Sequence, residues 1–399
     1  MHTIEKKPAN PTVKAGFVSV PTTGTQMQPS RIQVLALCIL ALSSCIPDPV
    51  IAVFEPGDLR PPAVVSWGAT GPAELLVVFD EAVRPDPKAF DVARRLSYQE
   101  LTGQELTAQD GTATSLPSEP EARLVPVVSI LSVREGPTSD GVLVVLDGDQ
   151  EPGLAYVLTG LVSDGAGNLS SFVLPYWGFN ADPAWLVINE LLTEGTSSRP
   201  DALELFVDRG GNLAGLTLFI GSPGLHDLRY VFPACGVAGG EFIILHLKPQ
   251  GLPEELDELD DVTLSGGQDA SKEARDFWVS GEPGSLSGKN GVVTLCASPT
   301  GAIMDAVAYS ERTSESDTKY DGFGTAAFRD RVAEIVAYAA WAIQGGKPAP
   351  GDCARSTGTT STRTICRSSD SADTDSAGDW HIVPTKGISL GKANSDEVY

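Results

Sequence analysis

Short apolar stretches, separated by turn residues, recur along the first half of the chain. They lie at 64–67, 74–79, 124–133, 142–146, 155–161 and 169–179. The composition agrees with frequent turns, because the 399 residues include 41 Gly and 29 Pro. Short strands joined by turns at regular spacing are typical of an antiparallel sandwich. We therefore predict a β-sandwich domain over residues 59–180.

A second series of apolar stretches begins at Trp185. Its members lie at 185–192, 201–207, 212–218, 230–233, 240–245, 291–295 and 303–309. Between residues 311 and 360 the apolar period changes to that of a helix, at Phe328, Val332, Ile335, Val336, Ala339 and Ile343. Gly345, Gly346 and Pro348 would end this helix. We predict that its apolar stripe packs onto the sheets; a helix that binds a partner is the alternative.

An eleven-residue apolar run, Ile32–Leu42, follows Arg31 near the N-terminus. As a helix it would rise only ~16 Å, about half of a ~30 Å hydrocarbon core, so it has the length of a signal-peptide core. The sequence Leu42-Ser43-Ser44-Cys45 that follows resembles the lipobox of bacterial lipoproteins. The resemblance implies that the Cys45 thiol receives a diacylglycerol and that cleavage makes Cys45 the new N-terminus. A buried core helix with an incidental cysteine is the alternative.

The boundaries of this leader follow from its composition. A start at Met27 gives a compact signal peptide over 27–44, so we predict that residues 1–26 are a mis-assigned start. Residues 45–58 are rich in proline and are predicted to form a lipidated tether. Cys45 is followed by Ile46 and not by the Asp that commonly retains such lipoproteins at the inner membrane, which favours the outer membrane and leaves open which face displays the protein.

The formal net charge of −24 limits the partners. Duplex nucleic-acid binders need basic patches that displace phosphate counterions, so no nucleic-acid partner is expected. An acidic surface also repels anionic headgroups, and membrane residence is therefore expected to come from the lipid alone.

Four cysteines remain beyond the lipobox, an even number that permits two disulfides in an exported chain. Cys353 and Cys366 enclose a short Thr- and Ser-rich loop, and Cys235 and Cys296 each follow an apolar stretch. Four unpaired thiols are the alternative. A zinc site is disfavoured because no partner stands at ligand spacing.

Two motifs in the first domain resemble the bacterial Ig-like domains of surface-layer proteins. Residues 79–83, Phe-Asp-Glu-Ala-Val, resemble a strand exit of that family, and residues 156–168 resemble its penultimate strand with a D-x-x-G-N turn. In that turn Gly165 and Gly167 can accept positive φ, and Asp164 and Asn168 can hydrogen-bond the backbone.

Motifs of the second half resemble the lamin-tail domain over residues 185–395. They are Ile188-Asn189-Glu190, Asp201-x-x-Glu204-Leu205, Leu213-x-Gly215-x-Thr217-Leu218 and Asp305-x-Val307-x-Tyr309, followed by 361–367, Asp373-Thr374-Asp375, Asp379-Trp380 and Pro384 to Asn394. The resemblance implies a compact Ig-like β-sandwich, in which 252–290 and 311–360 are insertions. The expected fold class is thus all-β, with two Ig-like β-sandwiches in tandem and one helical insertion in the second.

Sequence patterns for catalysis, metals or cofactors are not found. His226, His246 and His381 belong to no metal or nucleophile motif, and His246 is expected on a strand facing solvent or a polar neighbour. Residues 264–268 match an ABC-transporter signature without a P-loop and are interpreted as a glycine turn. The acidic run 254–261 is interpreted as a solvated, self-repelling loop; a site for divalent cations or a basic partner is the alternative.

The sequence therefore favours a membrane-anchored envelope lipoprotein that acts as a non-catalytic binding or structural module. Its expected partner is an envelope or extracellular protein or polymer. Two alternatives stay open. One is an accessory subunit of an envelope hydrolase, a nuclease or phosphatase. The other is a hydrolase itself, which would need a pocket with one of the three histidines beside carboxylates.

Overall fold

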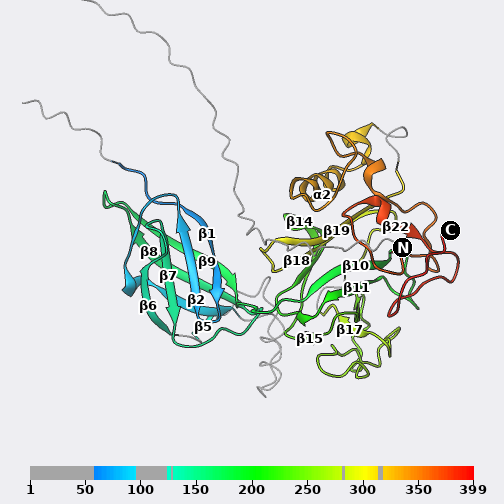
Figure 1. Ribbon diagram of the computed structural model, residues 1–399, viewed down its shortest axis with the longest axis horizontal. Helices are drawn as coiled ribbons and strands as arrows, with labels where there is room; N and C mark the ends of the chain where they lie inside the picture. Colours follow the sequence, from blue (N-terminus) through cyan, green and yellow to red (C-terminus); the bar gives the residue numbers. More distant parts are fainter. Residues whose placement is uncertain (1–57, 96–123, 127–128, 281–283, 313–317) are drawn as a thin grey trace, which may run out of the picture.

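The computed structural model describes residues 58–95, 124–126, 129–280, 284–312 and 318–399. Within these ranges the regular secondary structure is mostly β-sheet, arranged as two β-sandwiches in tandem with one α-helix, which confirms the predicted fold class (Figure 1). The predicted signal peptide, Cys45 and the tether up to residue 57 lie outside the described residues. None of the described helices is long and apolar enough to cross a membrane.

The first domain packs two antiparallel sheets face to face. One has the order β1-β2-β7-β6, and the other has the order β3-β8-β4-β5, with β9 also paired to β8. The strands are β1 (Val64–Gly71), β2 (Glu74–Phe79), β3 (Arg84–Pro85), β4 (Asp91–Arg95), β5 (Leu124–Pro126), β6 (Ile130–Glu135), β7 (Gly141–Leu146), β8 (Ala155–Ser163) and β9 (Leu169–Trp177). Alternate residues such as Leu75, Val77, Val142 and Val144 point inward and are fully buried.

The turn after β8 has the predicted chemistry. Both carboxylate oxygens of Asp164 accept hydrogen bonds from Asn168, one from its backbone N–H at 2.8 Å and one from its side-chain amide at 2.6 Å. Gly167 has a φ of 92°, as expected for this position. Asp58 and Glu81 also approach Asp164, but Asp164 is already satisfied within its own turn.

The second domain consists of a six-stranded sheet facing a five-stranded sheet. The first has the order β17-β16-β11-β10-β21-β22 and the second the order β14-β13-β18-β19-β20. The strands are β10 (Trp185–Leu192), β11 (Ala202–Arg209), β13 (Thr217–Ser222), β14 (Leu225–Val231), β16 (Phe242–His246), β17 (Arg275–Trp278), β18 (Asn290–Cys296), β19 (Ile303–Ser310), β20 (Ala354–Arg355), β21 (Ile365–Arg367) and β22 (Trp380–Ile382). A small pair, β12 (Gly211–Asn212) with β15 (Gly236–Val237), lies beside them. One large apolar core fills the space between the two main sheets.

The predicted helix is present as α2 (Ala326–Ala337) and packs on the five-stranded sheet against β13, β14 and β18. Phe328, Val332 and Ile335 are buried in the domain core, which confirms that the apolar stripe faces the sandwich. The helix ends earlier than Gly345, because Ala339 already has a left-handed φ of 57°.

The two domains contact one another at a close backbone approach. The side-chain amide of Asn180 donates to the carbonyls of Asn212 and Ala214, both at 2.9 Å. A Cβ built on Gly153 of the first domain would lie 2.4 Å from the backbone nitrogen of Gly215 in the second. Gly153 is therefore required by this contact as well as by its φ of 75°.

The sequence left open whether the four cysteines beyond the lipobox pair. Cys235, Cys296, Cys353 and Cys366 are all buried free thiols in the structure, which is the alternative of four unpaired thiols. Cys366 lies on β21 of the six-stranded sheet, whereas Cys353 directly precedes β20 of the other sheet. Cys235 belongs to the core between the sheets, while the Cys296 thiol is close enough to Glu334 on α2 to be influenced by its charge. Burial raises the pKa of Cys296 and of Cys353 to about 12, which keeps these thiols protonated.

The first turn of α2 offers a test of how firmly the helix is fixed. The Thr325 side chain accepts the N–H of Phe328 as the N-cap. We expect Thr325→Ala to lower the free energy of unfolding by about 1 kcal/mol, since that N–H loses its partner. Thr325→Ser keeps the hydroxyl and is expected to match the wild type. Equal urea midpoints for the alanine and serine variants would contradict the assignment.

Candidate functional site

The outer face of the six-stranded sheet carries a row of titratable side chains. Strand pairing sets Asp276, Ile244, Glu204, Glu190, Cys366 and His381 opposite one another in that order across all six strands. We call these six residues the polar row. Five of them are titratable, and four of those five are buried. Such a concentration of titratable groups away from the apolar core marks this face as the candidate functional site.

Two carboxyl groups meet at the centre of the polar row. Glu190 accepts hydrogen bonds from the Thr364 hydroxyl and from the backbone N–H and hydroxyl of Ser389. Glu204 accepts from the Asn189 amide at 2.7 Å and from the backbone N–H of Gly391. Burial raises the pKa of both, and the neighbouring Glu190 helps to raise that of Glu204 to about 8. The pair therefore holds at least one proton at neutral pH.

The C-terminal segment closes over this centre. Asn394 donates its side-chain amide to the carbonyls of Asn189 and Arg367, at 3.2 and 3.1 Å, and its oxygen accepts from Ser389. The residues of three separate motifs, near 189, 204 and 394, are thus joined in one buried network. These hydrogen bonds attach residues 389–394 of the C-terminal segment to the outer face of the six-stranded sheet.

Arg367 links the two sheets of the second domain from the other side of β21. Its guanidinium is fully buried and donates to both carboxylate oxygens of Asp305 on β19, at 3.0 and 3.1 Å. The same guanidinium pairs with Asp373 at 2.9 Å and lies 4.6 Å from the centre of the Trp380 ring. Burial raises the pKa of Asp305 to about 7, although Arg367 acts in the opposite direction.

The carboxylates around Arg367 are the one group in the second domain, within the described residues, whose spacing would suit a metal ion. Oxygens of Asp305, Asp373 and Asp375 lie within 4.8 Å of one another. However, the guanidinium of Arg367 already bonds Asp305 and Asp373 and supplies the positive charge that a cation would bring. The arrangement is an ion-pair cluster, and it offers no open coordination position.

At the β17 end of the polar row, Asp276 contacts His246 of the neighbouring strand β16. Nε2 of His246 lies 2.8 Å from Oδ1 of the fully buried Asp276, and the imidazole stacks on the Trp278 indole with 3.9 Å between ring centres. His246 lies on β16 opposite Trp278 on β17. The expectation of a polar neighbour for His246 is confirmed, while exposure to solvent is not, because only 7% of the residue is accessible.

A cavity of about 200 Å³ opens beside His246. Its wall consists of residues from β10, β11 and β16, the C-terminal segment and two surface loops: Leu192, Arg199, Pro200, Ala202, His246, Asp269, Ile388, Leu390 and Lys392. This lining contains no hydroxyl or thiol group that could serve as a nucleophile. For the hydrolase alternative, this cavity therefore provides a histidine beside carboxylates but no side chain in its lining that could act as the nucleophile.

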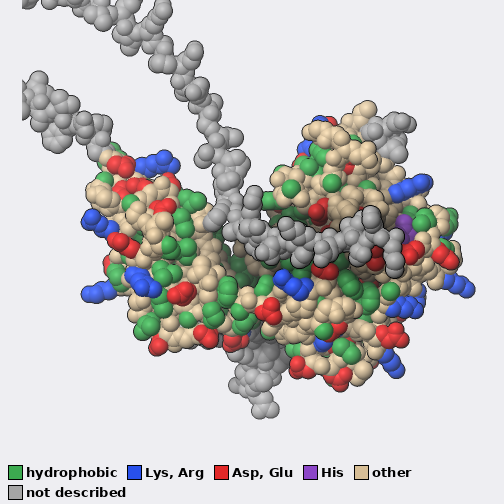
Figure 2. Space-filling view, in the orientation of Figure 1, with side chains coloured by type: hydrophobic (Ala, Val, Ile, Leu, Met, Phe, Trp, Pro, Cys, Tyr) green, Lys and Arg blue, Asp and Glu red, His purple; other side chains and the backbone are tan. Residues whose placement is uncertain are grey.

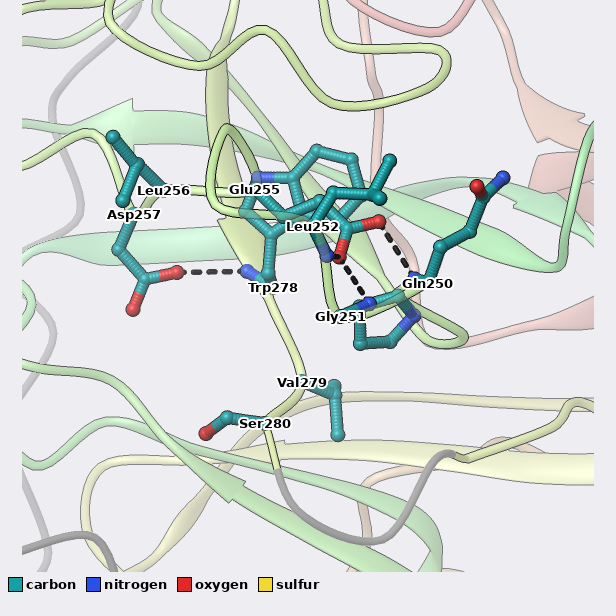
Figure 3. Close-up of a pocket in the computed structure, with 10 residues that line it drawn as sticks. Gln250, Gly251, Leu252, Glu255, Leu256, Asp257, Trp278, Val279 and Ser280 are labelled. Carbon is teal, nitrogen blue, oxygen red and sulfur yellow. Dashed lines mark hydrogen bonds between the residues drawn. The ribbon is translucent and has the colours of Figure 1, made fainter. Parts of the chain in front are cut away.

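The acidic run corrects another interpretation, because it is an ordered part of the fold. β17 is the edge strand of its sheet, and carboxylates of the run bond the backbone groups on its free side. Asp257 accepts the N–H of Trp278 and Glu258 accepts that of Asp276, both at 2.8 Å, while the Glu258 N–H donates back to the Asp276 carbonyl. Glu255 folds back to accept the N–H groups of Gln250, Gly251 and Leu252 (Figure 3).

Self-repulsion in the run is avoided because these carboxylates point at N–H groups instead of one another. Residues 249–252, 255–257 and 278–280 line an open groove of about 570 Å³ beside Trp278. Acidic side chains recur along this lower edge of the second domain, near the strand labelled β17 in Figure 1 (Figure 2). The predicted glycine turn over 264–268 packs here too, with the Ser265 hydroxyl accepting from the Trp278 indole at 3.0 Å.

The remaining predicted residues are not brought together. His226 lies on β14, where its Nδ1 is 3.1 Å from the carbonyl of Pro223 and its ring contacts Phe219 on β13. Nε2 of His381 lies 2.8 Å from the Ser395 carbonyl and 3.6 Å from the Cys366 sulfur. The partnership of His246 with Asp276 and Trp278 was missed, because the two strands pair in parallel across a long insertion.

Comparisons with known proteins are limited to parts of the chain. A family model described as "TP_1001_2nd: protein second domain" matches residues 184–382, just under half of the chain and nearly all of the second sandwich. A Treponema pallidum (strain Nichols) protein with the description "Uncharacterized protein" is 38% identical over 159 residues. The match covers 39% of this chain, and the chain spans only 39% of the length of that relative.

Two solved structures share distant similarity. The N-terminal part of the bacterial S-layer protein SbsC matches 62% of this chain and 43% of its own, at 13% identity and a TM-score of 0.22. A DUF4876 family protein from Bacteroides thetaiotaomicron VPI-5482 matches 68% of this chain and 94% of its own, at 13% identity and a TM-score of 0.29. TM-scores this low carry no argument about function.

The link between the sheets can be tested by removing its cation. We expect Arg367→Met to lower the free energy of unfolding by about 3–5 kcal/mol, because Asp305 is left buried without its partner. Urea denaturation followed by tryptophan fluorescence measures the loss. Arg355→Met, which removes an exposed arginine on β20, is expected to change stability by less than about 0.5 kcal/mol. Comparable losses for the two variants would contradict the role of Arg367.

The carboxyl pair predicts how stability depends on pH. Glu204 keeps its proton in the folded protein up to about pH 8, whereas the unfolded chain loses it near the ordinary pKa of 4.5. Unfolding between these values releases a proton, so the contribution of Glu204 to stability is complete below pH 4.5 and is lost as the pH rises through 8. We expect Glu204→Gln to flatten this decline by up to ~1.4 kcal/mol per pH unit.

Urea midpoints measured from pH 5 to pH 8 give both curves. Glu397→Gln changes an exposed carboxylate and is expected to keep the wild-type slope. Parallel curves for the wild type and Glu204→Gln would show that Glu204 is ionised in the folded protein.

Proposed function

We propose that the protein is an envelope lipoprotein, anchored through a lipid on Cys45, whose two sandwiches act as a non-catalytic structural or binding module. The first domain is proposed to be related to bacterial Ig-like domains and the second to lamin-tail domains, on the motifs described above. The proposed location is the outer membrane, because Ile46 follows the lipid-bearing cysteine.

One observation supports a non-catalytic role above all. The polar motif residues of the second domain, which would be the natural candidates for chemistry, are buried and hydrogen-bonded within the chain. Glu190, Glu204, Asp305 and Arg367 each have an accessible fraction of 0%. A group that is to act on a substrate must reach it, and these groups instead hold the C-terminal segment and the two sheets together.

The membrane part of the proposal rests on the lipobox. No described helix can span a bilayer. Each CH₂ group of an acyl chain that enters the bilayer contributes ~0.8 kcal/mol to membrane binding, and two or more acyl chains on one cysteine suffice for stable attachment. An accessory role beside an envelope hydrolase is compatible with the same anchor, but no feature of the described residues favours it.

Cys45→Ser tests the anchor directly. The wild-type chain, expressed with its leader in a bacterium that has two membranes, is expected in the carbonate-washed membrane fraction, and Cys45→Ser is expected to be lost from it. Cys38→Ser is the matched control, because that cysteine leaves with the signal peptide. Membrane retention of Cys45→Ser after carbonate washing would overturn the anchor. Separation of the inner and outer membranes on a density gradient then shows which of the two contains the wild-type protein.

A further inference from the structure

We propose that the cavity beside His246 is a binding site for a small organic monocarboxylate with a compact apolar body. The inference specifies a ligand class for the proposed binding module and rests on that proposal. It concerns the outer face of the six-stranded sheet, where the polar row meets the C-terminal segment.

The floor of the cavity contains a preorganised imidazole. His246 is more than nine-tenths buried, with Nε2 held by the fully buried Asp276 and the ring face held by Trp278. Asp276 is in turn fixed by the backbone N–H of Ser271 at 2.7 Å. With Nε2–H directed at Asp276, Nδ1 has no hydrogen-bond partner among the described residues. A ligand carboxylate can only accept a hydrogen bond, so the proposed complex contains the imidazolium form of His246, in which Nε2–H donates to Asp276 and Nδ1–H donates to the ligand.

The rim of the cavity is positive on an otherwise acidic protein. Lys392 and Arg199 line it together with a single carboxylate, Asp269, which lies 3.8 Å from Arg199. Lys392 forms no ion pair within the described ranges. The neighbouring Asp201 is already neutralised by Lys248 at 3.0 Å. An anionic group is therefore favoured at the rim between Lys392 and His246.

The rest of the wall selects for an apolar body of limited size. Leu192, Pro200, Ala202, Ile388 and Leu390 form it. A volume of about 200 Å³ is below the ~300–1,000 Å³ of sites for drug-sized ligands, so only a small molecule fits. Inorganic anions would leave these apolar side chains without contacts, and neutral molecules would leave Lys392 without a charged partner.

Titration of the detergent-solubilised full-length chain with benzoate tests the site. We expect saturable binding at one equivalent by calorimetry, together with a shift of the His246 ring resonances. These resonances are tractable because the chain has four histidines, and His246→Gln identifies them. Benzamide, which has the same shape without the charge, is expected to bind at least about five-fold more weakly.

Lys392→Gln is expected to weaken benzoate binding by about five-fold or more, because it removes the unpaired cation at the rim. Lys88→Gln, at an exposed lysine of the first domain, is the matched control and is expected to leave binding unchanged. Thermal unfolding of each variant verifies that it is folded.

Three results would overturn the inference: no saturable binding of benzoate, equal binding of benzoate and benzamide, or equal binding of inorganic phosphate. Equal affinities of the wild type and Lys392→Gln would also overturn it. Because Cys45 is not involved, these outcomes are independent of the membrane fractionation that tests the anchor.

Discussion

The second sandwich depends on one buried cation. Arg367 reaches from the six-stranded sheet to Asp305 on the opposing sheet, and it also bonds the Ile188 carbonyl at 2.7 Å. Removing a guanidinium from water is costly, and the cost is offset only because each of its nitrogens finds an acceptor or a carboxylate. Arg367 thereby ties β21 and β10 of one sheet to β19 of the other.

The outer face of the six-stranded sheet has three regions that differ in the charge and burial of their side chains. At its centre, Glu190 and Glu204 are enclosed by the C-terminal segment, and burial raises the pKa of both carboxyl groups. At the β17 side, the acidic run supplies acceptors to backbone N–H groups that would otherwise be unpaired. Between these regions lies the cavity with His246, where the wall is apolar and the rim is cationic. The proposed binding site is thus a small area of a face whose other polar groups are bonded within the fold.

The sequence was sufficient for the fold class, since alternating apolar residues report directly on which side of a strand is buried. The sequence also predicted α2, because its buried residues Phe328, Val332 and Ile335 recur at helical spacing. It did not predict where the helix ends, because Ala339 adopts the left-handed φ that a glycine usually marks at a helix C-terminus. Whether the cysteines pair could not be decided from the sequence, because spacing along the chain carries no information on which sheet each residue joins. The His246 site was missed for a similar reason: Asp276 and Trp278 arrive through a parallel pairing whose partners are separated by some thirty residues.

The protected edge of β17 has a consequence for copies of the protein held near one another. An unpaired parallel edge strand is a template onto which a second chain can add its own strand, and this risk grows when many molecules share a surface. Here the side chains of Asp257 and Glu258 occupy the bonding positions that such a strand would need. The carboxylates that complete the sheet also surround its border with negative charge. Molecules packed densely in two dimensions would therefore stay separate along this border instead of growing into fibres.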